Sequence, residues 1–122
     1  MAADLDALRR IDLVARQTIT PRDVMLYALG VGLGADPLDE AQLRFVYEDG
    51  LQPLPTLAIT LTYPPLLAAY AAAGVDPTRV LHGEQRFVYH AMAYAGDTLH
   101  FEQRIADIYA KKGRRIRRVG FP

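Results

Sequence analysis

Apolar residues recur at the spacing of an α-helix in one segment near the start of the chain. Thr20 has the side chain of a helix cap, Pro21 suits the first helical position, and Asp23 lies three residues after the cap. The residues that repeat at positions i, i+3, i+4 and i+7 are Val24, Tyr27, Ala28 and Val31. We therefore predict a helix that starts at Pro21 and ends among the glycines of residues 30–34.

Three further segments have the short apolar or alternating patterns of β-strands. They are residues 11–19, 43–47 and 57–63. Pro64 and Pro65 would stop the third strand, because proline has no N–H to donate to a sheet, and they can open a helix. We predict that helix over residues 66–73, where an apolar run ends at Gly74.

The C-terminal half of the chain is predicted to form a long hairpin. Residues 81–91 and 97–109 both have extended patterns, and Ala95-Gly96-Asp97 provides a turn between them. The second run alternates between two faces, which are Leu99, Phe101, Gln103 and Ile105 on one side and Thr98, His100, Glu102 and Arg104 on the other. Because helices and strands are segregated along the chain, we predict an α+β fold with an antiparallel sheet.

The composition is typical of a single globular domain. The chain has 122 residues, of which 51% are hydrophobic and 23% charged, and it contains no cysteine. Disulfides, thiolate metal sites and thiol nucleophiles are thereby excluded. No apolar run reaches the roughly 18 residues that span a bilayer, and the first residues do not resemble a secretory signal. We therefore expect a cytoplasmic protein with no membrane association.

The net charge of zero conceals a division between an acidic body and a basic end. Residues 1–110 carry a net charge of −6, and residues 111–122 carry +6. A cluster of arginines and lysines can bind phosphate groups, but the acidic body disfavours a nucleic-acid interface. We interpret the basic end as a solvated or disordered terminus, and a binding role for it remains the alternative.

Three histidines and one glycine-rich string are the remaining candidates for chemistry. His90 and His100 are about equidistant from the predicted turn, so we expect them to be cross-strand neighbours on a solvent face. The string His82-Gly83-Glu84-Gln85 would form either an acid–base pair or a buried polar network, and we favour the network. The glycines of residues 30–34 follow a helix, whereas those of a dinucleotide-binding loop precede one. We expect neither a metal site nor a cofactor.

Several strings occur in a fixed order that resembles one protein family. They are Arg22-Asp23-Val24-Met25-Leu26-Tyr27-Ala28-Leu29-Gly30-Val31-Gly32, Leu43-Arg44-Phe45-Val46-Tyr47-Glu48, Leu54-Pro55-Thr56, Leu81-His82-Gly83-Glu84-Gln85, Ala95-Gly96-Asp97-Thr98-Leu99, Ile105-Ala106-Asp107-Ile108-Tyr109 and Lys111-Lys112-Gly113. With them, residues 18–113 resemble the N-terminal half of MaoC-like (R)-specific enoyl-CoA hydratases, also called hydratase 2. The same strings resemble the non-catalytic subunits of related (3R)-hydroxyacyl dehydratases.

The resemblance implies a hot-dog fold over residues 1–113, in which an antiparallel sheet wraps around a helix. It also implies reversible hydration of trans-2-enoyl thioesters to (3R)-hydroxyacyl thioesters, in which an Asp and a His activate a water molecule. The family carries this pair in the motif Asp-x-Asn-Pro-x-His of its C-terminal hot-dog half. The nearest string here, Asp36-Pro37-Leu38-Asp39, lacks the Asn and the His. We therefore expect no catalytic residue in this chain.

The resemblance also gives roles to individual residues. Glu48 matches a glutamate near the family's active site, and Glu48 and His82 are the two candidates for catalysis if the chain is itself an enzyme. Leu54, Pro55 and Thr56 match a turn beside the acyl tunnel, so we expect them to bind substrate. His82 and Gly83 match the edge of the substrate groove. At the hairpin turn, the family often has Pro where this chain has Met92.

One main hypothesis and two alternatives follow. The chain is expected to be a non-catalytic hot-dog half or subunit, which binds the acyl chain of an acyl-CoA or acyl-carrier thioester and packs against a catalytic hot-dog partner. One alternative is a self-sufficient homodimeric hydratase or thioesterase, and the other is a binding module that uses the basic end. Residues 114–122 stand where the family has an apolar closing strand, so we expect a truncated or exposed last strand there.

Overall fold

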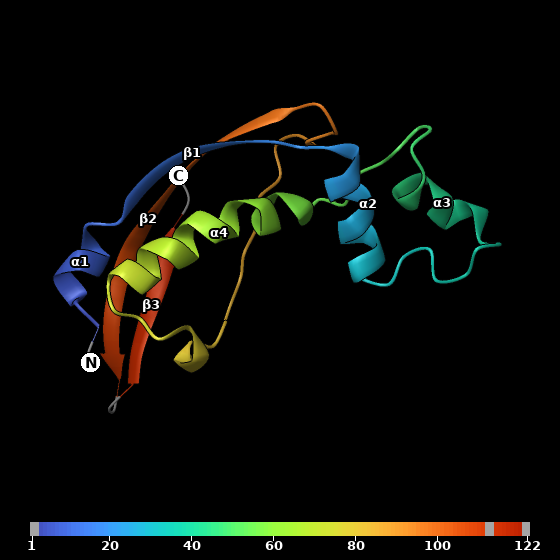
Figure 1. Cartoon of the computed structure of the whole chain (residues 1–122). Helices are drawn as coiled ribbons and strands as arrows, with labels where there is room; N and C mark the ends of the chain where they lie inside the picture. Colours follow the sequence, from blue (N-terminus) through green and yellow to red (C-terminus); the bar gives the residue numbers. More distant parts are fainter. Residues whose placement is uncertain (1–2, 112–113, 121–122) are drawn as a thin grey trace. The chain divides into compact units, whose positions relative to one another are not determined.

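The computed structural model describes residues 3–111 and 114–120, with the backbone alone described from residue 110 onward (Figure 1). The elements in chain order are α1 (Leu5–Arg9), β1 (Asp12–Thr18), α2 (Pro21–Gly30), α3 (Glu40–Val46), α4 (Leu57–Ala72), a 3-10 helix (Pro77–Arg79), β2 (Thr98–Lys111) and β3 (Arg114–Gly120). The strands form one sheet in the order β1-β2-β3. The predicted α+β class is confirmed.

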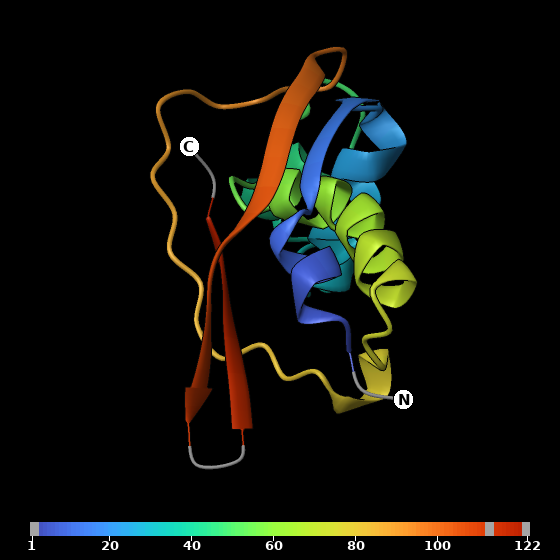
Figure 2. The ribbon, with the colours of Figure 1, turned by 90° about the vertical axis from the view of Figure 1, so that its left-hand side faces the viewer.

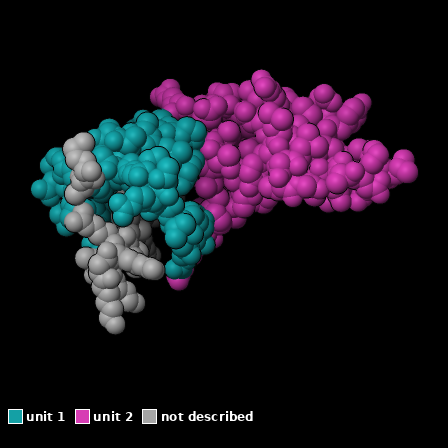
Figure 3. Space-filling view, turned by 60° about the horizontal axis from the view of Figure 1, so that its bottom comes forward, with its two compact units in different colours: residues 1–15, 62–85, 100–122 teal, residues 16–61, 86–99 magenta. Residues whose placement is uncertain are grey.

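The chain divides into two units, which Figure 3 shows in different colours. The first unit contains residues 1–15, 62–85 and 100–122. Its core joins α1, the C-terminal part of α4 and β2, and its buried members are Leu8, Ile11, Leu66, Tyr70, Ala73, Val75 and Ile105. Within this unit, the apolar face of α4 therefore packs against the sheet.

The second unit contains residues 16–61 and 86–99. Its core is smaller, with Ile19, Val24 and Leu57 buried. The partly buried residues packed around these three are Tyr27, Leu51, Leu61, Ala93, Ala95 and Leu99. The first turn of α4 and the face of α2 thus share one apolar cluster with the residues that lead into β2.

The predicted helix after Thr20 is confirmed as α2. The Thr20 hydroxyl accepts a hydrogen bond from the Asp23 backbone N–H at 3.1 Å, and the Asp23 carboxylate accepts one from the Thr20 backbone N–H at 2.9 Å. This reciprocal pair is a capping box, with Pro21 at the first helical position. The helix ends at Gly30, as the glycines of that region predict.

Gly34 lies where the loop after α2 meets α3. Its φ is +73°, and a Cβ atom at this position would lie 2.9 Å from Cγ2 of Val46. Its N–H also donates to Oε1 of Gln42 at 2.7 Å. The loop therefore approaches α3 too closely for any side chain at residue 34.

Changing Gly34 to Ala is expected to lower the free energy of unfolding by about 2–3 kcal/mol. A left-handed backbone costs an L-residue about 1–2 kcal/mol, and the contact with Val46 adds an overpacking cost. Gly32→Ala is the matched control, because Gly32 also has a positive φ, +98°, but no atom within 4 Å of the added Cβ. Urea unfolding followed by circular dichroism compares the variants. Equal losses in both would contradict the packing of Gly34 on α3.

The prediction of a strand over residues 43–47 is wrong, because these residues belong to α3 and its C-terminal end. The Asp39 carboxylate caps this helix by accepting a hydrogen bond from the Ala41 backbone N–H at 3.0 Å. Glu40 in the first turn and Arg44 in the last turn have the charges that favour a helix. A run of five residues was too short to distinguish a strand from a helix by its pattern.

The prediction of a strand over residues 57–63 is also wrong, since α4 runs without interruption from Leu57 to Ala72 and includes Pro64 and Pro65. Its buried residues are Leu57, Thr62, Leu66 and Tyr70. Thr62, Leu66 and Tyr70 are four residues apart, which is the spacing of one helix face, whereas Leu57 does not lie on that face and belongs to the core of the second unit. Burial of apolar residues of α4 in the core of each unit compensates for the hydrogen bonds that the prolines cannot donate. The predicted end at Gly74 is close to the observed one, and Gly74 has a φ of +73°.

The predicted hairpin is present only in part. Its turn is confirmed, because Asp97 donates its backbone N–H to the Tyr94 carbonyl at 3.1 Å and Gly96 has a φ of +97°. Residues 81–91, however, form no regular strand. The turn instead hydrogen-bonds to Ile19 after the end of β1, at 2.8 Å in both directions. The predicted cross-strand pairing of His90 with His100 is therefore wrong.

The predicted strand over residues 97–109 is confirmed as β2. Residues Leu99, Phe101, Gln103 and Ile105 are buried or half-buried, and their neighbours along the strand are exposed, as the alternation predicted. β2 pairs antiparallel with β3 from Lys111↔Arg114 to Arg104↔Gly120, with one irregularity between Ile105 and Asp107 (Figure 2). The side chains of the basic end, and all of residues 112, 113, 121 and 122, lie outside the described part of the chain.

Candidate functional site

The turn at residues 54–56 lies between α3 and α4. The Leu57 N–H donates to the Leu54 carbonyl at 3.1 Å, and the Ile59 N–H donates to the Thr56 carbonyl at 3.2 Å, so the turn leads directly into α4. The Tyr27 hydroxyl donates to Oγ1 of Thr56 at 2.6 Å. This hydrogen bond fixes the turn to α2.

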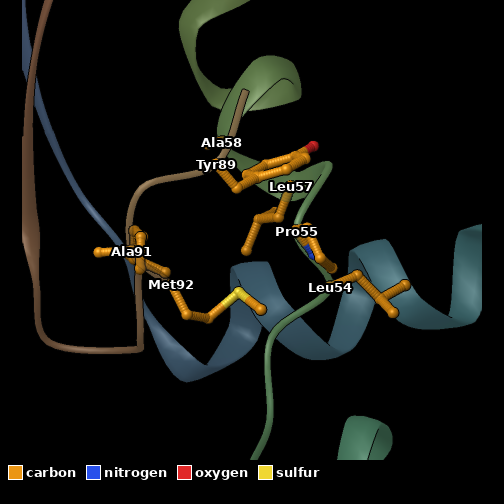
Figure 4. Close-up of a pocket in the computed structure, with 9 residues that line it drawn as sticks. Leu54, Pro55, Leu57, Ala58, Tyr89, Ala91 and Met92 are labelled. Atoms are coloured by element: carbon orange, nitrogen blue, oxygen red, sulfur yellow. The ribbon is translucent and has the colours of Figure 1, made fainter. Parts of the chain in front are cut away.

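Leu54 and Pro55 line an apolar cavity in the second unit, with a volume of about 40 Å³ (Figure 4). Its other lining residues are Ile19, Leu57, Ala58, Tyr89, Ala91, Met92 and Ala93. Every side chain in this set is apolar except for the Tyr89 hydroxyl. The cavity is therefore suited to hydrocarbon, and its lining includes no carboxyl or imidazole group that could activate water.

Four lining residues of this cavity, from Tyr89 to Ala93, were not predicted from the sequence. Tyr89, Ala91 and Ala93 are two residues apart, so an extended segment turns the same face toward the cavity. This alternation was the one sequence signal that could have identified these residues as sharing a face. Nothing local indicated that the segment would face the turn at residues 54–56.

His82 lies in the first unit and is exposed. Its Nε2 is 2.8 Å from Oε1 of Gln85, so the imidazole is paired with the amide three residues later. The predicted network is thus present in part, but it lies on the surface and not in the interior. Gly83 is exposed as well, and a Cβ atom there would meet nothing within 4 Å.

His82 also lines a second cavity, of about 260 Å³, whose described walls all belong to the first unit. The other lining residues are Tyr63, Leu67, Tyr70, Ala71, Val75, Pro77 and Val80. Asp76, next to two of them, accepts hydrogen bonds from the hydroxyl of Thr78 at 2.7 Å and from its N–H at 2.9 Å. The Thr78 hydroxyl is the main cause of the lowered pKa of Asp76.

Glu48 lies in the bend after α3 and is exposed. Among the described residues, no hydrogen bond or ion pair involves its carboxylate. Glu48 belongs to the second unit and His82 to the first, so the structure defines no shared site for the two catalytic candidates. Of the predicted substrate-binding residues, Leu54 and Pro55 line the cavity of the second unit and Thr56 belongs to the same turn, whereas His82 and Gly83 belong to the first unit.

Within residues 3–111 and 114–120, no group of three or more His, Asp or Glu side chains could hold a metal ion. Over the same described part of the chain, no helix combines the length and the apolar character that crossing a membrane requires.

Comparison with known proteins gives one family and several relatives. The model of the family described as "FAS1-like, dehydratase domain region" matches residues 12–118. Enoyl-CoA hydratase 2, peroxisomal, from Arabidopsis thaliana is 42% identical over 77 residues, which are 57% of this chain and 25% of that protein. Enoyl-CoA hydratase ChsH3 from Mycobacterium tuberculosis is 33% identical over 97 residues, 75% of this chain and 34% of that protein.

A third relative, 3-hydroxyacyl-thioester dehydratase Y from Mycobacterium tuberculosis, is 35% identical over 96 residues, 75% of this chain and 31% of that protein. The chain thus spans about a third or less of the length of the curated relatives it matches. No solved structure matches the chain. The family match and the arrangement of helices with an antiparallel sheet together confirm the predicted hot-dog fold. The chain belongs to the FAS1-like dehydratase family of MaoC-like hydratases.

Proposed function

We propose that this chain is a non-catalytic hot-dog half or subunit of an enoyl-thioester hydratase or (3R)-hydroxyacyl dehydratase. The observation that carries the proposal is the apolar cavity at the turn of residues 54–56, which offers a place for hydrocarbon and no group for proton transfer. The sequence also lacks the string Asp-x-Asn-Pro-x-His. The relatives are named hydratases or a dehydratase, and the segments that match this chain cover 25%, 34% and 31% of their lengths.

The hydration reaction indicates which steps the catalytic partner and this chain would each perform. Hydration adds a hydroxyl to C3 and a proton to C2 of a trans-2-enoyl thioester, so one water molecule must be deprotonated and a proton returned. An Asp and a His of the catalytic partner would do this, with the thioester carbonyl held by hydrogen-bond donors. The described cavity of this chain would hold the acyl tail and so position C2 and C3. The thioester would be carried by coenzyme A or an acyl carrier protein.

A surface for a partner is available along residues 87–93. No hydrogen bond involves these residues within the described part of the chain, although they are extended and rich in apolar side chains. Val88 is 79% exposed and Phe87 40% exposed. An unpaired extended segment is a template for another strand, and exposed apolar residues favour its coverage. We propose that a strand of the catalytic hot-dog partner pairs with this segment.

Isothermal titration of the full chain with butyryl-CoA tests the acyl-binding role. We expect binding that exceeds that of free coenzyme A, together with no turnover of crotonyl-CoA. Leu54→Asp should weaken butyryl-CoA binding at least about tenfold, because it places a charge in an apolar cavity. Leu38→Asp is the matched control, since Leu38 is 86% exposed and lies outside the lining. Equal binding of butyryl-CoA and coenzyme A by the unmodified chain would contradict the proposal.

A second candidate is the self-sufficient homodimer, and the observation in its favour is that His82 lines the larger cavity together with Tyr63 and Tyr70. In that case the isolated chain would hydrate or hydrolyse acyl thioesters. Turnover of crotonyl-CoA by the purified chain would select this candidate over the non-catalytic one.

A further inference from the structure

We infer that Met92 sets how much of an unbranched acyl tail the cavity of the second unit admits, so that short tails are selected. The inference rests on the proposed function, in which this cavity holds the tail. It adds the substrate class, a short unbranched acyl group, and the residue that determines it.

The walls of the cavity differ in how firmly they are held. Ile19 and Leu57 are 1% and 3% exposed, and both are members of the buried core, so their side chains are fixed by close packing. Ala91 and Ala93 contribute one methyl group each and cannot close the space. Met92 is 40% exposed and has a long unbranched side chain. Tyr89 is 48% exposed as well, but its ring is rigid, so Met92 is the flexible wall that can limit or admit a ligand.

The direction of the Met92 side chain fits this role. In Figure 4, it extends from the segment of residues 89–93 toward the part of the cavity where Leu57 and Pro55 lie. The Tyr89 ring lies on the Leu57 side of the same cavity. Removal of the Met92 side chain beyond Cβ would thus lengthen the space between the extended segment and the start of α4.

The volume sets the scale of the selection. A cavity of about 40 Å³ has room for roughly three groups of the size of a water molecule or a methylene. Each methylene that enters should tighten binding by about fourfold, and methylenes that remain in water should add little. Met92→Ala removes three non-hydrogen atoms, Cγ, Sδ and Cε, and so makes room for about three more carbons.

The first test uses 1-alkanols, from 1-propanol to 1-octanol, titrated into the ¹⁵N-labelled full chain and followed by NMR. For the unmodified chain, affinity should rise about fourfold per carbon and level off near four carbons. In Met92→Ala, the affinity should level off at an alkanol about three carbons longer than in the unmodified chain. In Met92→Phe, it should level off at a shorter alkanol. Met25→Ala, a change of the same kind on α2 and outside the lining, should keep the unmodified limit. A continuous rise to 1-octanol in the unmodified chain, or the same limit in both Met92 variants, would overturn the inference.

The second test measures kcat/KM for trans-2-enoyl-CoAs of four to ten carbons, with the chain mixed with a catalytic hot-dog subunit that carries Asp-x-Asn-Pro-x-His. Met92→Ala should raise the ratio of long to short substrates, up to about 60-fold for three added methylenes. If the mixtures turn over enoyl-CoAs and Met92→Ala has the same ratio of kcat/KM for long and short substrates as the unmodified chain, the role of Met92 is overturned. The proposed function is then unaffected. A different outcome is that the chain-length limit for alkanols shifts with residue 92, while no mixture turns over enoyl-CoA. This outcome would overturn the proposed function and, with it, the assignment of the cavity to acyl tails.

Discussion

Changing Glu48 to Gln or His82 to Ala is expected to lower kcat for crotonyl-CoA hydration less than tenfold in the assembly with a catalytic hot-dog subunit. Both side chains are exposed, and neither lines the apolar cavity that is proposed to hold the acyl tail. Replacing the Asp or the His of the partner's Asp-x-Asn-Pro-x-His motif should lower kcat by about 10²–10⁴-fold, the usual contribution of a general acid or base. Initial rates at saturating substrate measure all four variants.

This comparison separates the two candidate functions. His82→Ala should leave the fold of the first unit intact, because the imidazole is exposed and, within the described residues, its hydrogen bond is to Gln85. A loss of 10²-fold or more from either Glu48→Gln or His82→Ala would show that this chain supplies a catalytic group. That result would favour the homodimeric enzyme.

Changing Leu66 to Ala is expected to lower the free energy of unfolding by about 2–5 kcal/mol. Leu66 is 4% exposed and lies on α4 in the core of the first unit, beside residues from α1 and β2. Truncation removes its buried methyl groups and leaves a cavity that the surrounding helix and sheet can fill only in part. Since small domains have about 5–15 kcal/mol of stability, this loss is large. Urea unfolding followed by far-UV circular dichroism measures it.

The neighbouring residue on the same helix gives the control. Leu67 is 41% exposed, so Leu67→Ala removes the same atoms from a site that keeps contact with water. Its cost should be below about 1 kcal/mol. If both variants lost the same stability, the orientation of α4 in the first unit would be wrong.

Local signals predicted the parts of the fold that depend on neighbouring residues. Thr20, Pro21 and Asp23 identify the start of α2 because a capping box is complete within four residues. The alternation along β2 identifies its buried face, because successive side chains of a strand point to opposite sides. The class of the fold followed from the order of these elements along the chain.

Tertiary burial decided the elements that the sequence misassigned. The alternating run from Leu57 also has apolar residues at helical spacing, and the cores of both units select the helix. Pro64 and Pro65 were expected to separate two elements, yet they lie inside α4. A local pattern cannot show how much apolar surface a distant segment will cover.

The candidate site was predicted on one side only. The resemblance identified Leu54 and Pro55, which do line the apolar cavity. The opposite wall, with Tyr89 and Met92, comes from a segment more than thirty residues further along the chain. The sequence pattern of this segment predicts a strand, but the structure has no regular strand there. Its position depends on packing between distant parts of the chain, which spacing in the sequence does not encode.

The proposed role as a non-catalytic subunit is tested by titrating this chain into a fixed amount of a catalytic hot-dog subunit that carries Asp-x-Asn-Pro-x-His. The initial rate of crotonyl-CoA hydration is measured at each ratio, and each protein is also assayed alone. We expect no hydration by this chain alone and a rate that rises with added chain until the two proteins are equimolar. Full activity of this chain alone, or a partner rate that does not respond to its addition, would contradict the role of a non-catalytic subunit.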